Sequence, residues 1–341
     1  MKRIGYIFET IISVDNLRAA HFEVKRAKKP KRRKAAIEFE ENLEENLQRL
    51  HDELAAETWT MHPYRRMVRI ERGKRREIYY SQVHEDSVVQ HAILRTLGKR
   101  LQQKLIRDTY ASIKHRGTHD GVRRLRAFLS RIPADSPCYI EKGDVFHFYD
   151  SIKHEPLKDG VTWAIKERKT QRLMFRIIDS FPHGIPIGNA ISPLLANLHL
   201  TRLDHAAKEK FHIRGYYRYL DDIVAVAYGA DAKQRMKDFS AYAREHLANI
   251  GLKLKASEQV YPIERGGIDF LGYVFTRKTL RLRRKTERRF RRAAIRYKNK
   301  PNARNRATLS SYWGIVKWIS KSSRFWYSIF DTSIYNLEVL P

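Results

Sequence analysis

The sequence predicts a mixed α+β fold in which helical segments flank a small antiparallel sheet. Three observations support this prediction. Apolar residues recur at helical spacing over 35–56 and 84–106, as expected for helices with one buried face. Two short β-rich runs surround a turn at 72–74. A second pair of apolar runs, at 216–227, is interrupted only by two adjacent acids, and such pairs are typical of β-hairpins.

The rest of the chain continues this pattern. Pro193 stands where the first turn of a helix is expected to begin, a position that proline favours. The segment 277–300 carries 13 basic residues and one acid on a helical pattern. Further helices are expected at 192–212, 232–250, 277–300 and 309–330, further strands at 138–148 and 252–275, and a glycine-bearing loop at 110–121.

The charge balance indicates a polyanionic partner. The 341 residues include 68 Lys and Arg against 38 Asp and Glu, a net charge of +30, and nucleic acid is the usual partner for such a surplus. Eight of the ten residues from Lys25 to Lys34 are basic; this run is either a solvated loop or a nucleic-acid contact. The single cysteine, Cys138, excludes an internal disulfide and a cysteine-rich zinc site.

Membrane association is not expected. No apolar run reaches the roughly 18 residues that a membrane-spanning helix needs. The short apolar stretch at 4–8 is interrupted by Glu9 and makes a poor signal peptide. We therefore expect a cytoplasmic protein with no membrane partner.

Three carboxylates stand out as candidates for chemistry. Asp221 and Asp222 have apolar neighbours on both sides, and Asp144 follows the apolar stretch 138–140. Adjacent buried acids repel each other and lose hydration, so they need a compensating cation. Three such groups could hold two Mg²⁺ ions about 3.5–4 Å apart, aligning an attacking hydroxyl and a leaving pyrophosphate. The alternative is an ordinary turn, since aspartate favours turns.

Four segments, in the same order along the chain, resemble blocks of the reverse transcriptase family. DVFHFYDSI at 144–152 resembles its first metal-binding block, and YLDD at 219–222 resembles the second. The run 184–197, with Ile187-Gly188 and Ser192-Pro193, resembles the substrate loop and its helix. IDFLGY at 268–273 resembles the primer-grip hairpin.

The resemblance implies a right-hand polymerase fold with fingers, palm and thumb, built on a small antiparallel palm sheet. It places an N-terminal segment and the fingers at 1–135 and the palm at 136–275. A fingers insertion is expected near 155–183 and a helical thumb at 276–341. The basic stretch from 277 onward would follow the template–primer backbone in a salt-sensitive contact that does not depend on sequence.

The resemblance also assigns residue roles. Asp144, Asp221 and Asp222, with the carbonyl of Val145, would bind two Mg²⁺ ions, for which Mn²⁺ could substitute. Tyr149 would sit under the sugar and exclude a ribose 2′-hydroxyl, unless it is only a core aromatic.

Further contacts with the substrates are implied in the same way. Lys74 and Arg76 would clamp the triphosphate, and Lys253 or Lys255 would protonate the leaving pyrophosphate; each of these could also be a simple surface residue. The remaining expected substrate contacts are Ile187, Gly188 and Tyr219, and the expected primer-grip residues are Phe270, Leu271, Gly272 and Tyr273.

The implied activity is RNA-directed DNA polymerisation. It would use a template RNA, a DNA or RNA primer and deoxynucleoside triphosphates. Ile187 before Gly188 resembles the enzymes of diversity-generating retroelements, which copy a template RNA with errors at adenines. That group would add a structured non-coding RNA and a small basic accessory protein as partners. Its members usually continue with Ser-Gln, whereas this chain has Ser192-Pro193.

Two alternatives remain open. The same site could serve a defence-associated bacterial reverse transcriptase that makes an antiviral product. A non-catalytic RNA-binding protein with a polymerase-like fold is the other possibility, and the three intact carboxylates argue against it.

Overall fold

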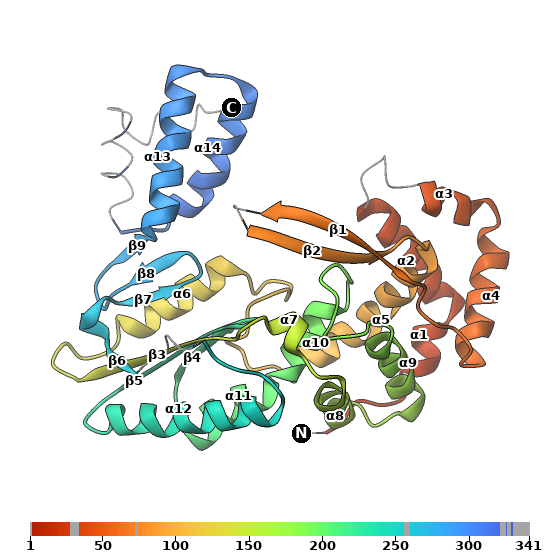
Figure 1. The fold of residues 1–341 in the computed structure, drawn as a ribbon, viewed down its shortest axis with the longest axis horizontal. Coiled ribbons are helices and arrows are strands. Elements are labelled where there is room, and N and C mark those ends of the chain that lie inside the picture. The colour runs from red at the N-terminus through yellow and green to blue at the C-terminus, as the bar shows by residue number, and fades with distance from the viewer. Residues whose placement is uncertain are drawn as a thin grey trace.

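The protein is described by a computed structural model over residues 2–27, 34–71, 74–255 and 260–320, together with Phe325 and Ile329. The basic residues at 28–33, the expected turn at 72–73 and Trp326 lie outside this described part. Figure 1 shows the N-terminal helices at one end of the molecule and the main sheet toward the other, with the C-terminal helices standing above that sheet. No helix in the described ranges has the length and apolar character needed to cross a membrane.

The N-terminal end is a group of helices. Its members are α1 (Phe8–Ile12), α2 (Val14–Ala27), α3 (Lys34–Glu41), α4 (Leu43–Ala55) and α5 (His84–Gln102). The single helix expected over 35–56 is in fact two helices, α3 and α4, interrupted at Asn42. Leu47, Leu50 and Leu54 are buried along one face of α4, as their spacing predicts. Together these helices form one end of a large hydrophobic core.

A two-stranded hairpin extends from this group of helices (Figure 1). Its strands β1 (Tyr64–Glu71) and β2 (Lys74–Ser81) are antiparallel, with Tyr64 opposite Ser81 and Glu71 opposite Lys74. The hairpin expected from the sequence is therefore confirmed. Val68 and Ile70 are exposed on it, and Figure 1 shows its two strands extending past the helices toward the other end of the molecule.

Shorter helices connect the two ends. They are α6 (Thr118–Leu129), α7 (Phe148–Ser151), α8 (His154–Ala164), α9 (Arg168–Asp179), α10 (Ser192–His199) and α11 (Thr201–His205). Pro193 lies in the first turn of α10, as predicted. The long helix expected over 192–212 is broken near Leu200 and ends in a π-helical turn, Ala206–Lys210. Leu203 and Ala207 of this segment are buried in the large core.

The main sheet has the strand order β4-β5-β3-β6, with every neighbouring pair antiparallel. The strands are β3 (Cys138–Asp144), β4 (Gly215–Tyr219), β5 (Asp222–Tyr228) and β6 (Tyr261–Pro262). The central strand β5 is buried on both faces, which explains its continuous apolar sequence. Ala225 and Ala227 belong to the large core on the side of α12 (Ala232–Asn249). Val224 and Val226 belong to a second core on the opposite face.

A second sheet and a helical hairpin complete the C-terminal end. The strands β7 (Ile268–Phe270), β8 (Tyr273–Phe275) and β9 (Leu280–Leu282) form an antiparallel sheet, followed by α13 (Arg284–Asn299) and α14 (Ala303–Val316). The helix expected from 277 begins only at Arg284, because β9 pairs with β8. The Tyr273 hydroxyl donates to the Ile315 carbonyl at 2.9 Å and links the sheet to α14.

Candidate active site

The turn between β4 and β5 carries two adjacent acids. Tyr219 and Asp222 are register partners, and Leu220 and Asp221 form the turn between them. Leu220 has a φ of 55°, in the left-handed region that disfavours side chains with a Cβ by roughly 1–2 kcal/mol. The Val145 amide donates to the Asp221 carbonyl at 3.2 Å. A strained turn held from a neighbouring segment therefore positions Asp221.

The third acid lies beside this turn. Asp144 is the last residue of β3 and the direct register partner of Asp222 in β5. The end of β3 and the β4–β5 turn thus bring Asp144, Asp221 and Asp222 to the same end of the main sheet. The three carboxylates singled out in the sequence are neighbours in the fold.

Burial and mutual repulsion disfavour the charged forms of these acids. Burial raises the pKa of Asp222 to about 7, and the charges of Asp144 and Asp221 act in the same direction. Burial also raises the pKa of Asp221, with a further contribution from Asp144. The Asp222 Oδ1 atom is buried without a hydrogen-bond partner among the described residues. Lys142 Nζ, 4.0 Å away, approaches this atom as a counter-charge, and the charge of Arg283 also opposes the rise in the Asp222 pKa.

A lysine partly compensates the site at Asp144. Lys255 forms an ion pair with the Asp144 carboxylate, and its amide donates to the Asp144 carbonyl at 3.0 Å. Lys253 has an exposed side chain, and its carbonyl accepts a hydrogen bond from the Phe146 amide at 2.8 Å. Of the two lysines considered in the sequence, Lys255 is the one whose ammonium group contacts an acid of the site.

The donor set fits a hard divalent cation. Three carboxylates and a nearby backbone carbonyl are oxygen ligands of the kind that Mg²⁺ prefers. The Asp222 Oδ1 atom lacks a hydrogen-bond partner among the described residues, and burial raises the pKa of Asp221 and Asp222, so a bound cation would stabilise their charged forms. Within the described ranges, no three His, Cys, Asp or Glu side chains form a ready-made metal cluster. An ion shared by the acids would compete with Lys255 for Asp144.

Tyr149 lies on the short helix α7, next to the acids. Burial raises its pKa to about 12, the charge of Asp221 adds to this shift, and Arg76 opposes it. The Ile185 amide donates to the Tyr149 carbonyl at 3.0 Å. Tyr149 is thus a half-buried ring within electrostatic range of both the acids and the β1–β2 hairpin.

The Ile187-Gly188 loop packs against the hairpin. The Ile187 carbonyl accepts a hydrogen bond from the Tyr79 amide of β2 at 2.8 Å. Gly188 has a φ of 135°, and a Cβ there would lie 2.3 Å from the Tyr79 carbonyl oxygen. Only glycine fits at this approach. Ile187 is half-buried, and Gly188 is exposed.

The two basic residues expected to bind triphosphate both lie on β2. Arg76 is exposed, and its charge acts on Asp221 and Tyr149. Lys74 begins β2, and its side chain lies outside the described part of the structure.

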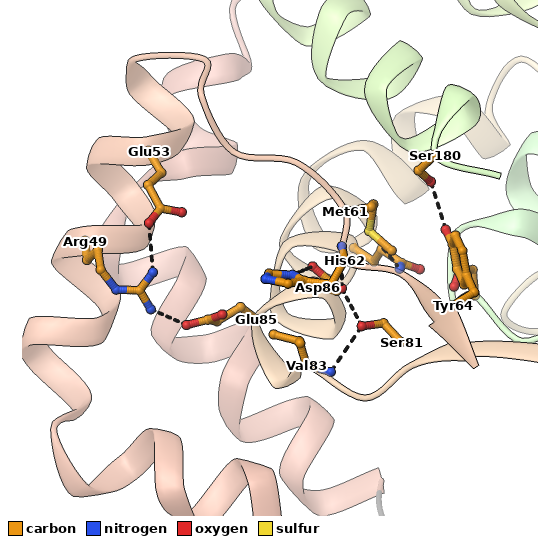
Figure 2. A network of polar contacts seen from close by, with 12 residues as sticks. Arg49, Glu53, Met61, His62, Tyr64, Ser81, Val83, Glu85, Asp86 and Ser180 are labelled. Carbon is orange, nitrogen blue, oxygen red and sulfur yellow. Dashed lines mark hydrogen bonds and ion pairs between the residues drawn. The ribbon is translucent and has the colours of Figure 1, made fainter.

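Figure 2 shows how the base of this hairpin is anchored. Asp86, fully buried in the first turn of α5, accepts hydrogen bonds from the His62 amide at 3.1 Å and from the Ser81 hydroxyl. The Tyr64 hydroxyl contacts the Ser180 hydroxyl at 2.9 Å. The start of β1 and the end of β2 are therefore both bonded to the helices. These bonds fix the direction of β2, the strand that carries Arg76.

The expected primer-grip segment forms a tight hairpin. Leu271 and Gly272 have φ values of 54° and 91° and form a two-residue turn between β7 and β8, as a type I′ turn requires. Phe270 and Tyr273 are buried beneath it. The turn lines a pocket of about 1120 Å³ with the start of α6 and residues of α13 and α14, including Arg289.

Comparison with known proteins identifies the family. The model of the family described as reverse transcriptase (RNA-dependent DNA polymerase) matches residues 83–275, more than half of the chain. The chain belongs to the reverse transcriptase family. The matched region contains the three acids, Tyr149 and the β7–β8 hairpin expected to be the primer grip.

More distant similarities agree with this assignment. This reverse transcriptase family member is 24% identical over 278 residues to Protein YkfC of Escherichia coli (strain K12), covering 69% of this chain and 72% of that protein. Its fold is similar to apo telomerase from Candida tropicalis, with a TM-score of 0.52 and 13% identity. That match covers 74% of this chain and 51% of the telomerase chain, so this chain spans about half the telomerase length. The right-hand polymerase fold predicted from the sequence is confirmed.

Two basic residues near the acids of this reverse transcriptase family member were not singled out in the sequence. Lys142 is two residues before Asp144 on β3, and side chains two apart in a strand share a face. Arg218 is the lone charge in β4, whose other residues are Gly215 and three tyrosines, and it is fully buried. Period-two alternation could have indicated Lys142, whereas the partners of Arg218 come from distant helices.

Proposed function

We propose that this chain is an RNA-directed DNA polymerase that extends a primer by two-metal-ion nucleotidyl transfer. The observation that carries the proposal is the meeting of Asp144, Asp221 and Asp222 at one end of the main sheet, inside the region that matches the family. Three half-buried carboxylates, compensated only in part by Lys255 and Lys142, suit Mg²⁺, or Mn²⁺ in its place.

Each neighbouring group has a role in this proposal. The three acids, with the Val145 carbonyl, would hold the ions. The chemistry supplied by such bound ions is activation of the primer 3′-hydroxyl and neutralisation of the departing pyrophosphate. Lys255, next to Asp144, is the better placed of the two lysines to deliver a proton to the pyrophosphate. Lys253 remains a candidate only through its exposed side chain.

The substrates would be held by the elements around the acids. Lys74 and Arg76 on β2 would contact the triphosphate, and Ile187, Gly188 and Tyr219 would contact the nucleotide. Tyr149 would exclude a 2′-hydroxyl. The hairpin formed by Phe270, Leu271, Gly272 and Tyr273 would hold the primer end. The exposed basic face of α13 would follow the template–primer backbone. We therefore propose the domain division given above, with the three-stranded sheet extending to Leu282 before the helical thumb.

Primer extension tests the proposal directly. The purified full chain is incubated with an RNA template, an annealed DNA primer, Mg²⁺ and the four deoxynucleoside triphosphates. We expect templated extension that stops when the metal is chelated. A folded protein that extends no primer on RNA or DNA with Mg²⁺ or Mn²⁺ would refute the proposal and leave the non-catalytic RNA-binding alternative.

A role in a diversity-generating retroelement is the finer proposal. It is supported by Ile187, whose carbonyl is bonded to β2 and whose side chain is aliphatic at a position of the substrate loop where an amide could make a polar contact with the nucleotide. Loss of such a contact should weaken discrimination. A structured non-coding RNA and a small basic accessory protein would then be partners. In the genome, a template and variable repeat pair and an accessory gene beside the coding sequence would support this role over the defence-associated alternative.

A further inference from the structure

Arg218 is an unusual residue in the strand that leads to the acids. It is fully buried on β4, and so is its partner Asp204 on α11. A buried guanidinium is costly unless its charge is paired and its donors are bonded. The structure meets both conditions, and one of the bonds leads to the catalytic turn.

All five N–H donors of a guanidinium have acceptors here. Nε and one terminal nitrogen donate to the two Asp204 oxygens at 2.7 and 2.6 Å. Two further bonds go to Asn197 of α10, one to its side chain at 3.1 Å and one to its carbonyl at 3.0 Å. The fifth goes to the Leu220 carbonyl at 3.2 Å.

The fifth bond connects this buried pair to the acids. Leu220 has the strained positive φ and directly precedes Asp221. The carbonyl of Asp221 is held in turn by the Val145 amide, one residue after Asp144. Two consecutive carbonyls of the turn are thus held by hydrogen bonds: that of Leu220 by Arg218, and that of Asp221 by the Val145 amide.

We propose that the Arg218–Asp204 pair is a positioning device that holds the β4–β5 turn in its strained shape. It thereby fixes Asp221 and Asp222 relative to Asp144. Arg218 and Asp204 are positioning residues, since neither would touch substrate. As a unit, the ion pair carries no net charge. The kinetic part of this inference rests on the proposed function, whereas its structural part does not.

The test must separate positioning from simple stability. Replacing Arg218 alone would leave Asp204 buried and unpaired, which is strongly destabilising. The variant of choice is Arg218→Met with Asp204→Leu and Tyr216→Phe. It removes both charges and the hydroxyl that donates to Asp204 at 2.9 Å, and apolar replacement of a buried pair often preserves stability. The control for loss of stability alone is Ile178→Ala. It removes buried side-chain volume where α9 packs on the core, 41 residues before Tyr219.

Hydrogen exchange gives the first readout and needs no activity. In the triple variant we expect the Val145 amide and the 219–222 segment to exchange roughly tenfold faster or more. The Ile178→Ala protein should keep wild-type protection at these sites. Unchanged exchange in a folded triple variant would overturn the inference, whether or not the wild type polymerises.

Primer extension gives the second readout. We expect kcat to fall by about 100-fold, as small misplacements of reacting groups can cause, with a much smaller change in the KM for the nucleotide. A triple variant with wild-type melting temperature and wild-type kcat would show that the pair is merely structural. An inactive wild type would refute the proposed function instead, and the exchange result would still decide the role of the pair.

Discussion

Asp144 and Asp222 face each other as register partners across the antiparallel pair β3 and β5. Residues far apart in the sequence thus place two acids side by side, and Asp221 adds a third from the adjacent turn. Two lysines lie beside these negative charges: Lys255 forms an ion pair with Asp144, and Lys142 lies near Asp222. Burial raises the pKa of Asp221 and Asp222, and the proposed binding of cations at this end of the sheet would stabilise their charged forms.

The half-buried ring of Tyr149 should select deoxynucleotides. Replacing it with valine opens space beside Asp221, so we expect the preference for dCTP over CTP to fall by roughly 10- to 100-fold. Single-nucleotide incorporation opposite a template guanine measures kcat/KM for dCTP and for CTP. Tyr149→Phe is the matched control, since it keeps the ring and should keep the preference. Undiminished selectivity in Tyr149→Val would contradict the assignment.

The basic face of α13 should set the salt dependence of nucleic-acid binding. Arg288, Arg292 and Arg296 are exposed at intervals of four residues, which places them on one helix face. Changing all three to glutamine should reduce the slope of log K against log salt by about 2–3. Binding of an RNA–DNA duplex at several salt concentrations measures this slope.

A matched set of substitutions controls for net charge. Lys233, Lys237 and Arg244 are exposed basic residues of α12, which packs on the main sheet away from α13 (Figure 1). Their replacement by glutamine should leave the slope nearly unchanged. Equal losses in the two sets would indicate a diffuse charge effect and argue against a specific contact by α13.

Glu141 should make stability depend on pH. Burial raises the pKa of its carboxyl to about 7, so the folded protein keeps this proton up to a higher pH than the unfolded chain does. The free energy of unfolding should therefore fall between about pH 4.5 and pH 7, by about 3 kcal/mol from this group. The glutamine side chain of Glu141→Gln has no charged form, so this fall in the free energy of unfolding should be absent from the variant.

Urea unfolding in a metal chelator checks this expectation. At pH 5 the variant and the wild type should be similar, because both side chains are neutral in the folded state. At pH 8 the variant should be the more stable protein. If the free energies of unfolding of the variant and the wild type differ by the same amount at pH 5 and at pH 8, Glu141 does not titrate as its burial requires.

Ile187 should control fidelity. Restoring an amide with Ile187→Gln should add a polar contact to the nucleotide and lower misincorporation at template adenine. Sequencing the products of primer extension on a defined RNA gives the error rate at each base. Equal and normal fidelity at adenine in both proteins would remove the support for a diversifying role.

Much of the site could be predicted because its signals are local. Two acids inside an apolar hairpin, and one after an apolar strand, identified Asp221, Asp222 and Asp144 from sequence. The β1–β2 hairpin was predicted for the same reason, since alternation and turn residues lie within one short segment.

The features that were missed depend on tertiary contacts. The break near Leu200, the strand β9 and the ion pair between Lys255 and Asp144 each require a partner from elsewhere in the chain. Arg218 is the clearest case, because its acceptors Asn197 and Asp204 lie on other elements. Periodicity carries no information about such partners.

The central claim is that Asp221 and Asp222 are metal ligands of a polymerase. The most direct measurement is Mg²⁺-dependent primer extension on RNA by the wild type and by the double variant Asp221→Asn, Asp222→Asn. The matched control is Asp231→Asn with Asp238→Asn, two exposed acids at α12 with the same change in charge. We predict that the wild type and the control extend the primer, and that the double variant folds but loses at least about 1000-fold in rate. Comparable extension by the double variant and the wild type would contradict this account.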